Sequence, residues 1–261
     1  MKATIFLLAL SGMLFIVRPG GKSTGAACPA GNVSAQLPDS LELYDPARYR
    51  VIPVALYKPK RGIKPGTKLI IFSHGYSGGA SPSPEREYRY LTESLASQGY
   101  LVASIRHELP TDSLMPTTGI PQVVRHPFWE RGSNNILFVI HELAKRYPQI
   151  DSTHITLIGH SNGGDMTALF ATSYPGLVDK IITLDNRRMA LPHTRHPRIY
   201  SLRSSDQPAD EGVLPTAEEI KKYNMQIVQL SHTRHNEMND NGTEAQHSEI
   251  NGYVVRFLND R

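Results

Sequence analysis

The 261-residue chain has a single cysteine, Cys28, and a single tryptophan, Trp129. One cysteine excludes an intramolecular disulfide framework. Charged residues make up 20% of the chain and hydrophobic residues 39%, so the composition of a disordered protein is also missing. The 20 glycines and 19 prolines follow no collagen-like period. These absences leave a globular protein that is long enough to bury a full core.

The sequence also lacks an excess of basic residues beyond its first 27 positions, although its formal net charge is +4. Lys2, Arg18 and Lys22 lie in a segment, residues 1–27, that has no acidic side chain. Of the 28 basic residues three belong to this segment, which leaves 25 against 24 acidic residues in the rest of the chain. The remaining Lys and Arg form no runs, so we expect no nucleic-acid partner.

The first 27 residues have the pattern of a secretory signal peptide. Lys2 precedes an apolar stretch over residues 3–17, and small residues follow it. The stretch is shorter than the roughly 20 residues of a membrane span, so an uncleaved membrane anchor is the lesser alternative. Residues 25–27 before Cys28 resemble a lipoprotein cleavage site but lack its aliphatic residue, so lipidation is not favoured. We expect a secreted or periplasmic protein.

Residues 28–41 read as a linker, and residues 42–261 as one catalytic domain. Apolar runs predict strands, and residues with 3–4 spacing predict helices. Their alternation indicates an α/β fold in which helices cover both faces of a mostly parallel sheet. The Pro-rich segment 108–132 has no clear period and is predicted to be a functional loop. The expected strands are 49–57, 68–73, 100–105, 155–158, 180–184, 199–202 and 225–230, and the expected helices are 85–97, 135–146, 166–173, 216–223 and one over 250–258.

The most informative motif is Gly159-His160-Ser161-Asn162-Gly163. A buried strand precedes it and a helix follows, which is the setting of a nucleophile elbow. Glycines are needed there because a sharp strand-to-helix turn crowds its neighbours. The motif predicts that Ser161 is a nucleophile.

A second motif supports this reading. His74-Gly75-Tyr76 follows the strand predicted over 68–73. Acyl transfer requires two donors for the developing oxyanion, and we expect the backbone amides of Tyr76 and Asn162 to supply them. His74 itself precedes the turn and is expected to be structural.

A serine nucleophile needs a base and an acid that orients the base, in the chain order Ser, acid, His. The acid should follow the strand at 199–202. Asp206, just past that strand, is the favoured acid, and Asp210 is the second choice. Asp185, at the end of the preceding strand, is a distant third.

The base should follow the strand at 225–230, where His232 and His235 are the candidates. His232 lies nearly on the strand. His235 lies in the loop, from which an imidazole can reach Ser161, and it is therefore favoured.

Two His-x-x-His pairs offer a competing interpretation, because two such loops can bind zinc. They are His193 with His196 and His232 with His235. The chain has no His-Glu-x-x-His motif, and the serine set is complete. We therefore expect neither a catalytic metal nor another cofactor.

Taken together, these motifs resemble the α/β-hydrolase superfamily over residues 42–260. The segment 45–59 resembles the opening of dienelactone-hydrolase-like and platelet-activating-factor-acetylhydrolase-like esterases. The resemblance implies an eight-stranded sheet and ester hydrolysis without a cofactor. The nucleophile here is Ser161 rather than the Cys of dienelactone hydrolases proper. Only residues 186–198 separate two late strands, so no large cap domain is expected.

The expected activity is hydrolysis of a small-molecule or lipid-like carboxylic ester through an acyl-enzyme intermediate. Trp129 is a candidate substrate contact, and packing of its loop onto the body is the alternative role. Two rivals remain: a serine peptidase or amidase on the same fold, and a non-catalytic envelope binding protein. The sequence does not indicate the oligomeric state.

Overall fold

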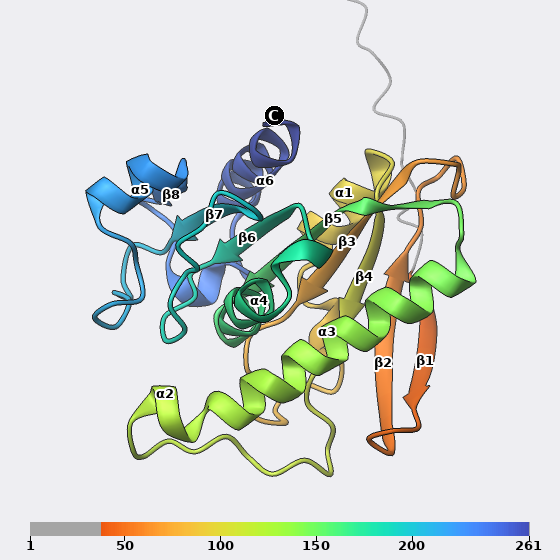
Figure 1. Ribbon diagram of the computed structural model, residues 1–261, viewed down its shortest axis with the longest axis horizontal. Helices are drawn as coiled ribbons and strands as arrows, with labels where there is room; N and C mark the ends of the chain where they lie inside the picture. The colour runs from red at the N-terminus through yellow and green to blue at the C-terminus, as the bar shows by residue number, and fades with distance from the viewer. Residues whose placement is uncertain (1–37, 261) are drawn as a thin grey trace, which may run out of the picture. The chain divides into compact units, whose positions relative to one another are not determined.

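The computed structural model describes residues 38–260 (Figure 1). The predicted signal peptide and Cys28 lie outside this range. The first strand, β1 (Asp39–Asp45), begins inside the predicted linker and was not expected from the sequence. Over the described residues, no helix combines the length and the apolar character that crossing a membrane would require.

Eight strands form one sheet in the order β1-β2-β4-β3-β5-β6-β7-β8. Strand β2 is antiparallel to both β1 and β4, and the other neighbours are parallel. The mostly parallel, eight-stranded sheet that the sequence and its resemblance predicted is therefore confirmed. The remaining strands are β2 (Arg50–Tyr57), β3 (Thr67–Ser73), β4 (Leu101–Ile105), β5 (Ile150–His160), β6 (Lys180–Leu184), β7 (Arg198–Arg203) and β8 (Gln226–Gln229).

Both faces of the sheet are buried, which explains why its central strands are continuous apolar runs. In β3, Leu69 and Ile71 belong to one core, and Ile70 and Phe72 belong to the other. Successive side chains of a strand point to opposite faces of the sheet, so the four residues from Leu69 to Phe72 contribute to both cores. Each core is closed by amphipathic helices.

The helices lie on both sides of the sheet (Figure 1). Helices α3 and α4 cover the face with Leu69 and Ile71, and α1 and α6 cover the opposite face. Their bounds are α1 (Arg89–Ser97), α2 (Pro121–Val124), α3 (His126–Arg146), α4 (Asn162–Ser173), α5 (Ala217–Tyr223) and α6 (Glu244–Asn259).

The prediction of a loop over residues 108–132 is wrong in its second half. Helix α2 lies within it, and α3 begins at His126 rather than at residue 135. Gly132 lies inside this helix, where glycine lowers helix stability. In α3 it permits close packing instead, because a Cβ there would collide with the Met166 side chain of α4.

No helix interrupts the connection between β6 and β7, residues 185–197, so no large cap domain is inserted there. Strands β3 to β8 run parallel, and their carboxyl ends meet at one edge of the sheet. In open α/β sheets this is the edge at which ligands bind. The chain leaves β5 at Ser161, β6 at Asp185 and β8 shortly before His235.

Candidate active site

Ser161 occupies a sharp turn between β5 and α4. Its φ of 52° and ψ of −119° lie in a region that non-glycine residues rarely adopt. The glycines beside it make the turn feasible. A Cβ at Gly159 would strike the carbonyl of Gly163, and one at Gly163 would strike the carbonyl of Ser73. The Ser161 hydroxyl therefore stands at the N-terminus of α4, as the motif predicted.

His235 contacts Ser161 directly. The Ser161 hydroxyl donates a hydrogen bond of 2.8 Å to Nε2, and Nδ1 of the same ring lies 2.5 Å from Oδ2 of Asp185. A carboxylate only accepts, so Nδ1 carries the proton and Nε2 is free to accept. His232, the other candidate, is exposed.

The expectation that Asp206 orients this imidazole needs correction, because the carboxylate on the ring is Asp185. Asp185 follows β6 and has a positive φ of 58°, next to the strand that carries Ser161. Asp206 instead accepts a 2.8 Å hydrogen bond from the backbone N–H of His235. Asp210, the second choice, pairs with Arg188 at 2.8 Å.

The Asp185 carboxylate is completely buried and fully partnered. Ser204 donates to it through its hydroxyl (2.6 Å) and its backbone N–H (3.0 Å), and Nη2 of Arg203 lies 2.9 Å away. Burial alone would raise the pKa of Asp185. The hydrogen bonds from His235 and Ser204 and the charge of Arg203 outweigh burial and lower this pKa. The carboxylate is therefore negative at neutral pH.

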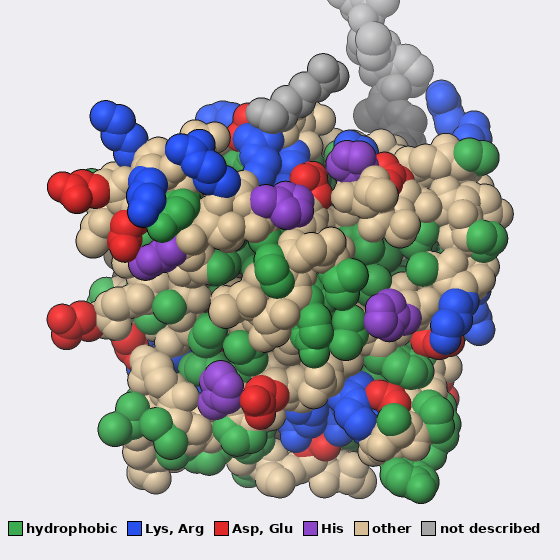
Figure 2. Space-filling view, in the orientation of Figure 1, with side chains coloured by type: hydrophobic (Ala, Val, Ile, Leu, Met, Phe, Trp, Pro, Cys, Tyr) green, Lys and Arg blue, Asp and Glu red, His purple; other side chains and the backbone are tan. Residues whose placement is uncertain are grey.

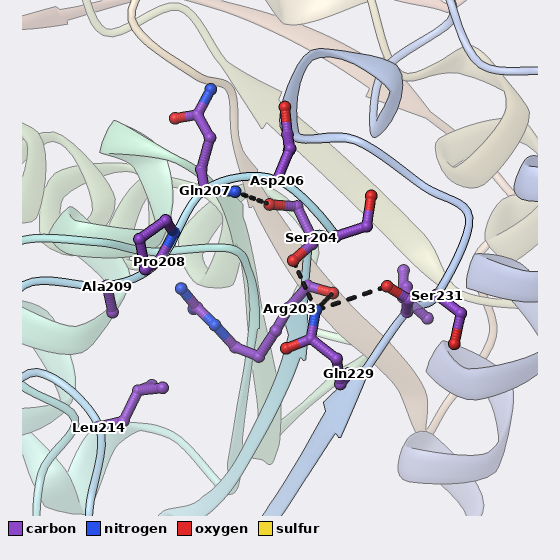
Figure 3. A pocket seen from close by; sticks show the side chains of 11 residues that line it. Arg203, Ser204, Asp206, Gln207, Pro208, Ala209, Leu214, Gln229 and Ser231 are labelled. Carbon is purple, nitrogen blue, oxygen red and sulfur yellow. Dashed lines mark hydrogen bonds between the residues drawn. The ribbon is translucent and has the colours of Figure 1, made fainter.

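One cavity lies beside Ser161, and a second cavity, of about 580 Å³, lies between the loop after β7 and the end of β8 (Figure 3). Asp206 lines the second cavity. In the wall of this cavity, Nε2 of Gln229 donates a 2.6 Å hydrogen bond to the backbone carbonyl of Ser204. The loop that was expected to carry the acid thus supports Asp185 from behind, through Ser204.

Of the two predicted oxyanion donors, Tyr76 lines the same cavity as Ser161, and Asn162 is the next residue after Ser161 in the chain. Tyr76 follows β3, and Asn162 is the first residue of α4. Within residues 38–260, neither backbone amide donates a hydrogen bond to another protein group. Tyr76 is held in place by its hydroxyl, which accepts a 2.8 Å hydrogen bond from the backbone N–H of Met115.

A buried chain of hydrogen bonds connects the Tyr76 loop to His235. The backbone N–H of Gly75 donates to the hydroxyl of Tyr88 (3.1 Å), and that hydroxyl lies 2.7 Å from Nδ1 of His160. Nε2 of His160 donates to the carbonyl of His235 (3.1 Å), so Nδ1 accepts from Tyr88. Burial, with a further contribution from His235, lowers the pKa of His160 to about 3. His160 is therefore neutral and purely structural at physiological pH.

Trp129 does not reach the cavity beside Ser161, which corrects its assignment as a substrate contact. The side chain is fully buried in α3, and its indole N–H donates a 2.9 Å hydrogen bond to Oδ1 of Asn162. Nδ2 of Asn162 faces Oε1 of Glu108 at 3.5 Å. Burial raises the pKa of Glu108 to about 7. Trp129 and Glu108 thus hold the side-chain amide of Asn162 in place.

The two His-x-x-His pairs do not form a metal site. Nδ1 of His193 lies 3.2 Å from Glu219 on α5, whereas His235 is bound to Ser161 and Asp185. Among residues 38–260, no three His, Cys, Asp or Glu side chains are arranged to hold a metal ion.

Exposed apolar side chains stand around this edge of the sheet. Figure 2 shows hydrophobic groups in both lower corners, over α2 and over the β1–β2 hairpin. Ile120 and Val123 near α2 are each 66% exposed, and Tyr49 in the hairpin is 85% exposed. None of these three side chains lines the cavity beside Ser161.

No family model and no curated protein sequence matches the chain, but solved structures do. A dienelactone hydrolase-like promiscuous phosphotriesterase from metagenomic libraries matches with a TM-score of 0.64 and 9% identity, over 85% of this chain and 98% of that one. A serine hydrolase without a lid from Xanthomonas campestris matches with a TM-score of 0.55 and 14% identity, over 86% and 97%. The chain has the α/β-hydrolase fold. A fungal esterase from Rhizomucor miehei matches this fold with a TM-score of 0.60 and 15% identity, over 88% and 84%.

The sequence did not indicate the groups that support the site. Ser204 and Arg203 lie just after and at the end of β7, where only carboxylates had been sought. Tyr88 lies outside every motif, and His160 occupies a variable position of the Ser161 motif. The one available signal was the position of Asp185 at the carboxyl end of a central parallel strand, where such ends converge.

Proposed function

We propose that this protein is a serine hydrolase that cleaves carboxylic esters, with Ser161, His235 and Asp185 as its catalytic triad. One observation carries the proposal: the line of hydrogen bonds from the Ser161 hydroxyl to Nε2 of His235, and from Nδ1 of that ring to Asp185. The nearby esterase structures add support at the level of fold.

In the acylation step, Nε2 of His235 takes the proton of Ser161 as the hydroxyl oxygen attacks the ester carbonyl. Charge then develops on the carbonyl oxygen. The backbone amides of Tyr76 and Asn162, which have no protein acceptor within residues 38–260, would donate to it. The buried negative charge of Asp185 stabilises the imidazolium that forms.

The imidazolium next donates its proton to the leaving alcohol, and the acyl group stays on Ser161. A water molecule, activated by the same nitrogen of His235, then attacks the acyl-enzyme. Its proton passes through His235 back to Ser161, and the carboxylic acid leaves. The enzyme returns to its starting state without a metal or an organic cofactor.

Replacement of Ser161 tests the proposal. We expect Ser161→Ala to lower kcat on a short acyl ester by several orders of magnitude, because the nucleophile is lost. Ser173→Ala, at the exposed far end of the same helix, is the matched control and should retain activity. An unchanged rate in Ser161→Ala would contradict the mechanism.

Labelling by a fluorophosphonate separates an enzyme from a non-catalytic binding protein. The probe should modify the folded wild type at Ser161, as mapped by peptide mass spectrometry, and should not modify Ser161→Ala. Absence of labelling in the wild type would favour the binding protein. Matched ester and amide substrates with the same acyl group would then separate an esterase from a peptidase or amidase.

A further inference from the structure

A cavity of about 360 Å³ opens beside Ser161 and is built almost entirely from polar groups. Its walls come from the loop after β3, the residues around Glu87, and the loop after β8. The groups that face it beyond the triad include three amide side chains, one carboxylate and one aromatic ring: Asn236, Asn239, Asn241, Glu87 and Tyr76.

This cavity is lined by both Ser161 and the base His235. His235 itself lines the cavity, and Asn236, Asn239 and Asn241 follow His235 in the chain. The group that receives the proton from Nε2 of His235 is the oxygen of the leaving alcohol. An alcohol that receives this proton can therefore extend into the cavity that the three asparagines line.

The chemistry of the walls selects the kind of alcohol. An amide side chain offers both donors and an acceptor, and a carboxylate accepts from two hydroxyls. A chain of methylenes would leave these groups without partners, at a cost in free energy, whereas neighbouring hydroxyls satisfy them. The Glu87 carboxylate also disfavours an anionic alcohol, and the Tyr76 ring offers an apolar face for stacking.

The walls are held in place before any substrate arrives. The backbone N–H of Asp240 donates to the carbonyl of Glu87 (2.8 Å), which joins two walls of the cavity. Oδ1 of Asn239 accepts from the backbone N–H of Asn241 (3.0 Å), and the carbonyl of Asn239 lies 3.0 Å from Nε2 of His247. Such preorganisation lowers the entropy lost on binding.

We propose that the alcohol half of the ester is polyhydroxylated, so that the enzyme removes acyl groups from a sugar or a similar polyol. This inference rests on the proposed ester hydrolysis and adds its substrate class.

The test compares two esters that share an acyl group, a mono-acetylated glucose and hexyl acetate. We expect kcat/KM of the wild type to be at least tenfold higher for the sugar ester. The double variant Asn236→Ala, Asn241→Ala should reduce the ratio of the two kcat/KM values about tenfold, because the exposed amides bind only the sugar. Asn134→Ala, an exposed asparagine of α3 in a different pocket, is the matched control and should leave the ratio unchanged.

The outcomes separate this inference from the proposed function. Activity on hexyl acetate that equals or exceeds activity on the sugar ester would overturn the polyol assignment alone. So would a ratio that does not change in the double variant. An enzyme inactive on both esters and unlabelled at Ser161 would overturn ester hydrolysis itself, and the polyol assignment with it.

Discussion

Asp206 binds the backbone of His235 and not its ring. Its Oδ1 accepts from the His235 N–H at 2.8 Å, while Nδ1 of the imidazole lies 2.5 Å from Asp185. Two carboxylates from different loops thus act on one histidine. Asp206 positions the main chain of the loop, and Asp185 determines the orientation and the tautomer of the ring.

The division of roles between the two carboxylates predicts very different variants. Asp185→Asn should lower kcat by roughly three to four orders of magnitude, because an amide can donate to Nδ1 and stabilise the wrong tautomer. Asp206→Asn keeps an acceptor for the His235 N–H and should lower kcat by less than about tenfold. Steady-state kinetics on one ester decides between them. A larger loss in Asp206→Asn than in Asp185→Asn would contradict the assignment.

The Tyr88 hydroxyl joins the Gly75 N–H to His160, so its removal should affect both stability and activity. Tyr88→Phe leaves two buried polar groups without partners, which costs about 1–3 kcal/mol each before relaxation. We expect a lower urea midpoint and a reduced kcat with little change in KM, since the Tyr76 amide loses its support. Tyr100→Phe, a half-buried tyrosine next to β4, is the control. A urea midpoint of Tyr88→Phe as high as that of Tyr100→Phe would show that the hydrogen bonds of the Tyr88 hydroxyl contribute little to stability.

The hydrogen bond from Trp129 to Asn162 is testable by an almost isosteric change. Trp129→Phe keeps an aromatic ring in the core but removes the indole N–H. The side-chain Oδ1 of buried Asn162 then has no donor, which should reduce the free energy of unfolding by about 1–3 kcal/mol. The smaller volume of the Phe side chain reduces it further. Trp129 is the only tryptophan, so unfolding is followed by circular dichroism. Wild-type stability in this variant would refute the supporting role.

The buried carboxyl of Glu108 predicts a pH dependence of stability. Burial raises its pKa from 4.5 to about 7, so the folded state holds this proton more tightly than the unfolded state. The stabilisation is complete below about pH 4.5 and is lost as the pH rises through 7. At 1.36 kcal/mol per pKa unit the loss is at most about 3 kcal/mol.

Glu108→Gln stays neutral and serves as the comparison. The free energy of unfolding of the wild type, relative to this variant, should fall between pH 5 and pH 8. Burial also raises the pKa of Asp165, to about 6, but Asp165 is present in both proteins and cancels in the difference. A pH-independent difference would mean that Glu108 is ionised throughout.

The sheet was predictable because its central strands are short apolar runs with clear ends. Leu69 to Phe72 are apolar on both faces, which only a doubly covered strand requires. Strand β1 escaped detection because it is an edge strand whose polar and apolar residues alternate over a short length. Its partner β2 was predicted as an antiparallel edge strand because of Pro53. It is antiparallel, but the edge prediction is wrong, because β1 pairs with its outer side.

The choice of acid could not be made from spacing. Asp185 and Asp206 both follow parallel strands and both come between Ser161 and His235 in the chain. What distinguishes them is side-chain direction, which depends on the positive φ of Asp185 and on the partners Ser204 and Arg203. Likewise, the sequence alone could not tell that Gly132 serves helix packing, because Met166 is distant in the chain.

The proposed acid, Asp185, follows β6, so the loop after β7 supplies supporting groups and none of the proposed triad. Residues 207–209 and Leu214 border the second cavity but hold none of the proposed reacting groups. Insertions there would enlarge one wall of that cavity without shifting Ser161, His235 or Asp185. Evolution and engineering can therefore diversify this stretch, as a graft site for a lid or a binding element, while the catalytic geometry stays intact.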